Sequence, residues 1–163
     1  MTYYNKDEKI KILKSYLGHL FVPINNISKN KYKLIKSRLE KTKNPCTKLI
    51  IAKEIDYLKL SASILLTSIL KYPEYKIVDI DSLMNTWLGY DVGETKDAIK
   101  TVNTLVILSF GGSFFKNIQG LIESVVLKRQ FDGYNTIILT TQRDKALCSC
   151  LNAEDIIELR GSK

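Results

Sequence analysis

The N-terminal quarter of the chain spaces its apolar positions with the period of an α-helix. Two such stripes predict amphipathic helices over residues 6–21 and 28–41, with Ser28 as the candidate cap of the second. Pro23 ends the first helix, and the Asn-Pro45 pair separates the two helices from the rest of the chain. The apolar positions that define the stripes are Ile10, Leu13, Leu17, Leu20, Tyr32, Ile35 and Leu39.

After Pro45, short apolar runs alternate with helical patterns. This alternation, at intervals of about 25 residues, is typical of a parallel sheet covered by helices, so we expect a three-layer α/β fold. We therefore predict two domains, a basic helical hairpin over residues 1–43 and an α/β domain over residues 44–163. The predicted strands are 49–52, 77–80, 105–108, 136–139 and 156–159, and the predicted helices are 58–71, 82–87, 94–100 and 116–129.

The net charge of +8 is confined to the predicted hairpin. Residues 1–43 hold eleven basic and three acidic side chains, whereas the remaining residues hold fourteen of each. Such asymmetry indicates a basic arm that faces nucleic acid or an acidic partner. The alternative is a solvated lysine-rich surface that reflects only the codon usage of an AT-rich genome.

Other compositional features narrow the class of protein. The chain has no run of about 18 apolar residues, so we expect no membrane span, and its polar N-terminus predicts no secretory signal. Cys46, Cys148 and Cys150 lack the paired spacing of a zinc site, so we expect no metal. His19 has no Ser or Cys partner nearby, which favours a satisfied surface or core histidine over a catalytic one. A reducing cytoplasm is the simplest location for such a chain.

Residues 48–161 carry, in order, several segments that resemble one family of ATPases. The family is the AAA+ ATPase domain of bacterial replicative-helicase loaders, which is close to the ATP-binding helpers of transposition. The resemblance implies a parallel sheet of P-loop NTPase type, AAA+ or RecA-like. It rests on the family's second strand with its helix, its Walker B strand, its sensor strand with the preceding helix, and its closing strand. The corresponding segments are Tyr75 to Met84, Asn103 to Gly112, Leu127 to Gln142 and Ile156 to Ser162.

The phosphate-binding loop of that family is altered in this chain. A P-loop reads Gly-x-x-x-x-Gly-Lys-Ser/Thr, because glycines let backbone N–H groups close around phosphate and the hydroxyl binds Mg²⁺. Counted from the first predicted strand, Lys53 and Leu58 occupy the two glycine positions and Leu60 occupies the hydroxyl position. Lys59 falls where the phosphate-binding lysine would lie. A surface lysine that stands there by coincidence is the alternative.

The distribution of acidic side chains also argues against a working nucleotide site. Glu54 and Asp56 lie in the altered loop, where their charge would repel a triphosphate. The third predicted strand is followed by Ser109 and Phe110, which lack the anionic oxygens that Mg²⁺ needs. Gln142, at the sensor position, retains only the capacity to bind a water. We therefore predict a pseudo-ATPase with no catalytic residues and no cofactor.

Two functions are compatible with these observations. The first is an accessory factor of DNA replication or mobile-element maintenance that binds a replicative helicase, a helicase loader or another AAA+ protein, with single-stranded DNA as a further candidate. The second is a stand-alone basic nucleic-acid-binding module, in which Tyr3, Tyr4, Tyr16 and Tyr32 stack on bases. The candidate binding residues are Lys6, Lys9, Lys11, Lys14, Lys29, Lys31, Lys33, Lys36, Arg38, Lys41, Lys43, Arg129 and Arg143.

For two groups of residues in the α/β domain, the sequence leaves two interpretations open. Arg129 and Arg143 fall near positions where AAA+ proteins present charge to their neighbours, but a plain surface role is equally compatible with the sequence. Phe110, Phe114 and Phe115 cluster at the predicted sheet edge. We interpret them as filling the vacant nucleotide pocket, and an exposed patch for a partner is the alternative.

Overall fold

The computed structural model divides the chain into two compact units. The helical unit comprises Met1–Lys41, Ala52–Pro73 and Leu159–Lys163, and the sheet unit comprises Thr42–Ile51 and Glu74–Glu158. This division differs from the predicted boundary at residue 44, because residues 52–73 group with the N-terminal helices. The structure describes residues 4–39, 47–71, 74–80, 83, 99–110, 124–143 and 145–160.

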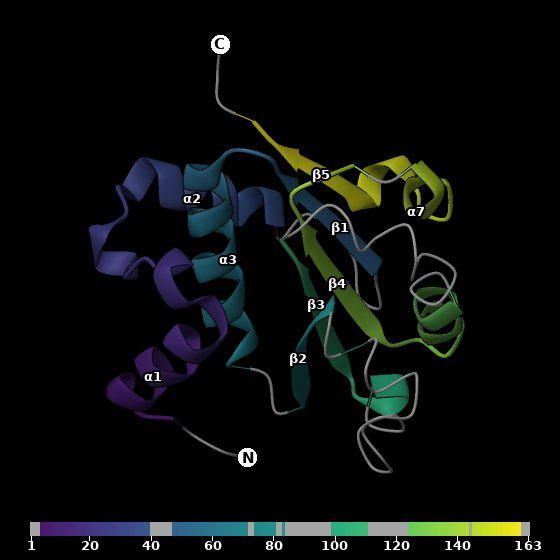
Figure 1. Cartoon of the computed structure of the whole chain (residues 1–163), viewed down its shortest axis with the longest axis horizontal. Helices are drawn as coiled ribbons and strands as arrows, with labels where there is room; N and C mark the ends of the chain where they lie inside the picture. Colours follow the sequence, from purple (N-terminus) through teal and green to yellow (C-terminus); the bar gives the residue numbers. More distant parts are fainter. Residues whose placement is uncertain are drawn as a thin grey trace. The chain divides into compact units, whose positions relative to one another are not determined.

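The described residues of the helical unit form three α-helices and two short 3-10 turns (Figure 1). The α-helices are α1 (Lys6–Leu17), α2 (Lys29–Leu39) and α3 (Ile55–Ile69). The turns η1 (Gly18–Leu20) and η2 (Ile24–Asn26) lie between α1 and α2. Helix α3 packs against both α1 and α2, and the Ser63 hydroxyl accepts a hydrogen bond from the Val22 amide at 3.0 Å.

Local signals set the bounds of the two N-terminal helices. Helix α1 begins with a capping box, in which Asn5 and Glu8 exchange side-chain-to-backbone hydrogen bonds of 2.8 and 2.9 Å. It ends four residues earlier than predicted, because Gly18 adopts a φ of +54° and the chain continues as a 3-10 turn. The Ser28 hydroxyl accepts from the Lys31 amide at 3.4 Å, which confirms the predicted cap of α2.

The buried faces of the helices agree with most of the predicted stripes. Leu13, Leu17, Leu20, Ile35 and Leu39 are buried. In α3, every residue from position 61 to position 66 is buried, so this helix is covered on more than one side. Tyr32 differs from the prediction, since it is only half-buried and leaves part of its ring accessible.

The sheet unit is built around a five-stranded parallel sheet in the order β2-β3-β4-β1-β5 (Figure 1). The five predicted strands are all present, most of them one or two residues longer than predicted. Their bounds are β1 (Thr47–Ala52), β2 (Tyr75–Asp79), β3 (Thr104–Ser109), β4 (Asn135–Thr140) and β5 (Ile156–Leu159). The central strands β3 and β4 are almost wholly buried, as near-continuous apolar strands of parallel sheets are.

Aliphatic side chains from the strands and the adjoining helical segments form the core of the sheet unit. Its members are Leu49, Ile51, Val78, Ile80, Leu83, Ile99, Leu105, Ile107, Val125, Val126, Ile138 and Leu147. In the described helical segment 124–131, Val125 and Val126 are buried. Helix α7 (Lys145–Ser149) and the 3-10 turn η3 (Ala153–Asp155) were not predicted.

Some predictions fall on parts of the chain outside the described residues. These are the helix at 82–87, most of the helix at 94–100, the start of the helix at 116–129, and the side chains of Lys41, Lys43, Cys46, Phe114 and Phe115. Among the described helices, none is both long enough and apolar enough to cross a membrane.

Candidate functional site

The segment that aligns with a phosphate-binding loop is helical in this chain. Helix α3 begins at Ile55, three residues earlier than predicted, so only Lys53 and Glu54 separate it from β1. The Leu58 amide donates to the Glu54 carbonyl at 2.9 Å, which makes it part of the helix ladder. A P-loop binds phosphate through backbone amides that face an open loop. Here the amide of Leu58, at the second glycine position, is already bonded within the first turn of α3.

The side chains of this segment do not replace the lost backbone donors. Leu58 is 4% exposed and lies in the core, while Lys53 is exposed and Lys59 and Leu60 are half-buried. Lys59 lines a hollow of about 460 Å³ in the helical unit, together with Lys31 and Asp56. Two lysines and one aspartate give this hollow a mixed charge, and Val22, Ile27 and Leu60 supply apolar lining.

At the carboxyl edge of the sheet, polar residues without carboxylates end the central strands. The register places Ile51, Thr140 and Ser109 side by side on β1, β4 and β3. Ser109 is 1% exposed, and its hydroxyl has no hydrogen-bond partner in the described parts of the chain. Phe110, the next residue, is half-buried. Neither residue offers the carboxylate oxygens that a magnesium ion would require at this edge.

Gln142 lies in a tight turn just beyond β4. The backbone amide of Gln142 donates to the Thr140 hydroxyl at 3.2 Å, and the Gln142 side chain is exposed. Within the described ranges, no three His, Cys, Asp or Glu side chains gather closely enough to hold a metal ion. His19 lies in η1 and is exposed, so it is a surface histidine rather than a core one.

The basic residues of the hairpin are mostly accessible. Lys9 and Lys36 are half-buried, and the other described candidates within the hairpin are exposed. The exposed members are Lys6, Lys11, Lys14, Lys29, Lys31, Lys33 and Arg38. The structure therefore places the described part of this charge where a polyanion can reach it.

One face of α2 combines an aromatic ring with several of these lysines. Lys29, Tyr32, Lys33 and Lys36 follow the i, i+3, i+4, i+7 spacing that brings helix residues onto one side. The Lys36 ammonium lies 5.5 Å from the centre of the Tyr32 ring, within the range of a cation–π contact. We call these four residues the α2 stripe.

A hollow of about 340 Å³ opens beside the N-terminal end of the α2 stripe. It is lined by Ile24, Asn25, Ile27, Lys29, Tyr32 and Lys33. Most of its exposed lining is apolar, and the polar groups at hand are the Asn25 amide, the Tyr32 hydroxyl and two ammonium groups. The hollow thus combines apolar side chains, an aromatic ring and positive charge from within ten residues of sequence.

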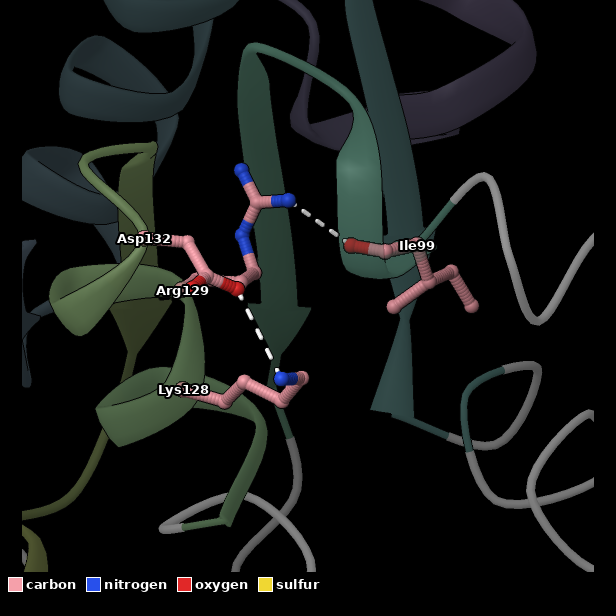
Figure 2. A network of polar contacts seen from close by, with 4 residues as sticks. All are labelled: Ile99, Lys128, Arg129 and Asp132. Atoms are coloured by element: carbon pink, nitrogen blue, oxygen red, sulfur yellow. Dashed lines mark hydrogen bonds and ion pairs between the residues drawn. The ribbon is translucent and has the colours of Figure 1, made fainter.

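Arg129 is not a surface residue, which corrects the prediction that it presents charge to a neighbour. It is 1% exposed, and its guanidinium donates to the Thr136 hydroxyl at 2.9 Å, the Ile99 carbonyl at 2.8 Å and the Asn135 carbonyl at 2.9 Å. Figure 2 shows its side chain pointing away from Lys128, which instead pairs with Asp132 at 3.7 Å. Burial lowers the pKa of Arg129 to about 10, so it remains protonated at neutral pH.

Arg143 has the accessible position that both of its predicted alternatives require. Its guanidinium is half exposed and lies 3.3 Å from a carboxylate oxygen of Glu158. The two candidate arginines of the sheet unit therefore differ, since one is a buried structural group and the other is accessible.

Comparison with known proteins supports the fold. No protein-family model matches the chain, and no curated sequence matches it. Among solved structures, the chain is similar to domain III of the replication initiation protein DnaA from Thermotoga maritima, with a TM-score of 0.54 and 14% identity. The match covers 98% of this chain and 69% of that one. At this identity the likeness shows the fold alone, and it confirms the predicted α/β fold of P-loop, AAA+-like type.

Sequence reasoning missed the hollow beside α2 and the role of Arg129. The sequence names Tyr32 both in the apolar stripe and as a candidate stacking residue, and the spacing that places it on one helix face with Lys29, Lys33 and Lys36 is the signal that could have found the site. Arg129 had no comparable signal, because the acceptors that hold it are a hydroxyl and two carbonyls from other segments.

Proposed function

We propose that the chain is a non-catalytic, AAA+-like accessory factor of DNA replication or mobile-element maintenance that works by binding. The main support is the contrast between its two charged regions. The segment equivalent to a P-loop is a closed helix turn beside Glu54 and Asp56, whereas the described lysines of the hairpin are largely exposed. Such a chain is suited to holding a polyanion and poorly suited to holding Mg·ATP.

The partner that best fits this surface is DNA. A net charge of +8 carried by one quarter of the chain favours phosphate contacts, which release counterions and need no base-specific geometry. The likeness to a domain of a replication initiation protein gives a context for this proposal. A replicative helicase, a helicase loader or another AAA+ protein is the protein partner that we propose within that context.

A stand-alone nucleic-acid-binding module is the second candidate function. The α2 stripe favours it, because aromatic and basic residues on one helix face can hold nucleic acid without a protein partner. Co-purification of a hexameric helicase or a loader with the tagged chain from its host supports the first function. Strong DNA binding with no such partner supports the second.

The proposal is tested by the affinity of the full chain for a fluorescein-labelled oligonucleotide, measured by anisotropy between about 50 and 200 mM salt. The test variant replaces Lys6, Lys11 and Lys14 by Gln. The matched control replaces Lys71, Lys128 and Lys145 by Gln, which removes the same charge outside the hairpin. We expect the hairpin variant to bind more weakly and with a smaller salt slope, while the control stays near wild type. Equal losses in both variants would contradict a hairpin-based site.

A further inference from the structure

We propose that the hollow beside α2 receives one unstacked base of single-stranded nucleic acid, with the flanking phosphates held by the α2 stripe. This inference rests on the proposed DNA binding and specifies its strand type and its residues. It begins from the lining, in which the Tyr32 ring and two isoleucines meet two lysines and an asparagine. A base has an apolar face and polar edges, and so it matches both components of this lining.

The ring of Tyr32 is the stacking surface. Tyr32 is half-buried, so its position is fixed by packing while part of it remains open to the hollow. Lys36 lies 5.5 Å from the ring centre and further orients the ring. Stacking on a side chain that is already held in place costs less conformational entropy than stacking on a free one.

The lysines of the α2 stripe determine the direction in which a nucleic-acid strand runs across the site. Lys29 and Lys33 are exposed, line the hollow and lie one helical turn apart. Lys36 continues the same face by almost another turn. A strand that follows α2 therefore meets a row of positive charge that begins in the lining of the hollow and continues along the helix, as single-strand grooves present it. The bases of a duplex are stacked and paired, so a duplex can use the charge but cannot fill the hollow.

The hollow also offers a hydrogen-bonding group to the base edge. Asn25 is exposed and lines the hollow, and its side-chain amide carries both donors and an acceptor. This group can pair with the Watson–Crick edge of any base, so we expect only a weak sequence preference.

The first experiment uses the wild-type full chain and a single strand of about 15 nucleotides that contains one 2-aminopurine. Stacking of that base on an aromatic ring quenches its fluorescence. We expect quenching that saturates with binding, together with tighter binding of the single strand than of a duplex of the same length. Binding without any quenching, or equal affinity for the duplex, would overturn the inference and leave the proposed DNA binding intact.

The second experiment compares substitutions at the ring. We expect Tyr32→Leu to weaken single-strand binding about tenfold, while Tyr32→Phe, which keeps the ring, binds like wild type. Tyr57→Leu is the matched control, because Tyr57 is a half-buried tyrosine of α3 that does not line the hollow and is not a candidate binding residue. Circular dichroism verifies that each variant is folded.

The lysines are tested separately from the ring. Replacing Lys29 and Lys33 by Gln should lower the salt slope for a single strand by about 1.4, from a contribution of about 0.7 per phosphate contact. If these substitutions weaken binding while Tyr32→Leu has no effect, the nucleic acid lies on the lysines alone and the base site is refuted. If the wild-type chain binds no nucleic acid at all, both the inference and the proposed function fail.

Discussion

The two units of this chain use basic side chains in opposite ways. In the sheet unit, Arg129 is buried and donates three hydrogen bonds to groups from separate segments. In the helical unit, Lys29 and Lys33 are exposed beside an open hollow. The difference teaches that the environment of a positive charge, and not its presence, decides whether it stabilises the fold or binds a partner.

The largest expected effect comes from removing the buried charge. Arg129→Ala leaves the Ile99 and Asn135 carbonyls and the Thr136 hydroxyl without their donor, so we expect a loss of about 3 kcal/mol or more in the free energy of unfolding. Urea denaturation measures this loss. Arg143→Ala is the matched control, and similar losses in the two variants would erase the contrast between buried and exposed arginines.

The sheet edge provides a second test of burial. Ser109 is 1% exposed, so Ser109→Asp would place a carboxylate in an apolar environment, and we expect it to destabilise the sheet unit by about 3 kcal/mol at neutral pH. Burial raises the pKa of such a carboxyl above that of the unfolded chain. The destabilisation should therefore be small below about pH 4 and should grow as the pH rises.

Ser109→Ala tests whether loss of the hydroxyl group alters stability by itself, apart from the negative charge that Ser109→Asp adds. Because the Ser109 hydroxyl has no hydrogen-bond partner in the described residues, Ser109→Ala should be neutral or slightly stabilising. Thermal unfolding followed by circular dichroism measures both variants. A large loss in Ser109→Ala would mean that the hydroxyl has a partner that matters to the fold.

We expect that restoring the P-loop motif in the altered segment does not restore nucleotide binding. Restoring the motif with Lys53→Gly, Leu58→Gly and Leu60→Thr should not create an ATP site, since Glu54 and Asp56 remain and the segment belongs to the first turns of α3. We expect no rise in the midpoint of thermal unfolding when Mg·ATP is added to this variant. A rise that depends on nucleotide concentration would show that the closed turn can reopen around phosphate.

A small effect is also expected at the partly exposed ion pair of the sheet unit. Arg143 and Glu158 lie 3.3 Å apart, but Arg143 is half exposed, so Arg143→Ala should cost about 1 kcal/mol or less. The loss should shrink further at high salt, as screening weakens the pair. Urea denaturation at low and high salt measures both values, and a loss that is independent of salt would contradict this account.

The elements of the sheet were predictable, whereas the start of α3 was not. Runs such as Leu105 to Leu108 are aliphatic and short and are bounded by polar residues, so their strand character is local. Glu54 and Asp56 carry the polarity of a loop, so the sequence pattern predicts the helix start three residues too late. Packing of α3 against α1 and α2 is a property of distant residues that local polarity does not reveal.

The candidate site was predictable in charge but not in shape. The excess of lysine in residues 1–43 can be counted from the sequence, and most of the described members proved to be exposed. The hollow depends on how η2 meets the first turn of α2, which no spacing rule specifies. Arg129 was misassigned for the same reason, because its burial depends on acceptors supplied by strand β4 and by Ile99.

The central claim, that this chain works by binding and not by turnover, is tested most directly by its affinity for a labelled single strand in Mg·ATP and in magnesium chloride of the same ionic strength. Our account predicts the same dissociation constant in both conditions, because the closed first turn of α3 offers no place for the nucleotide. A change of about tenfold in that constant on adding Mg·ATP would contradict it.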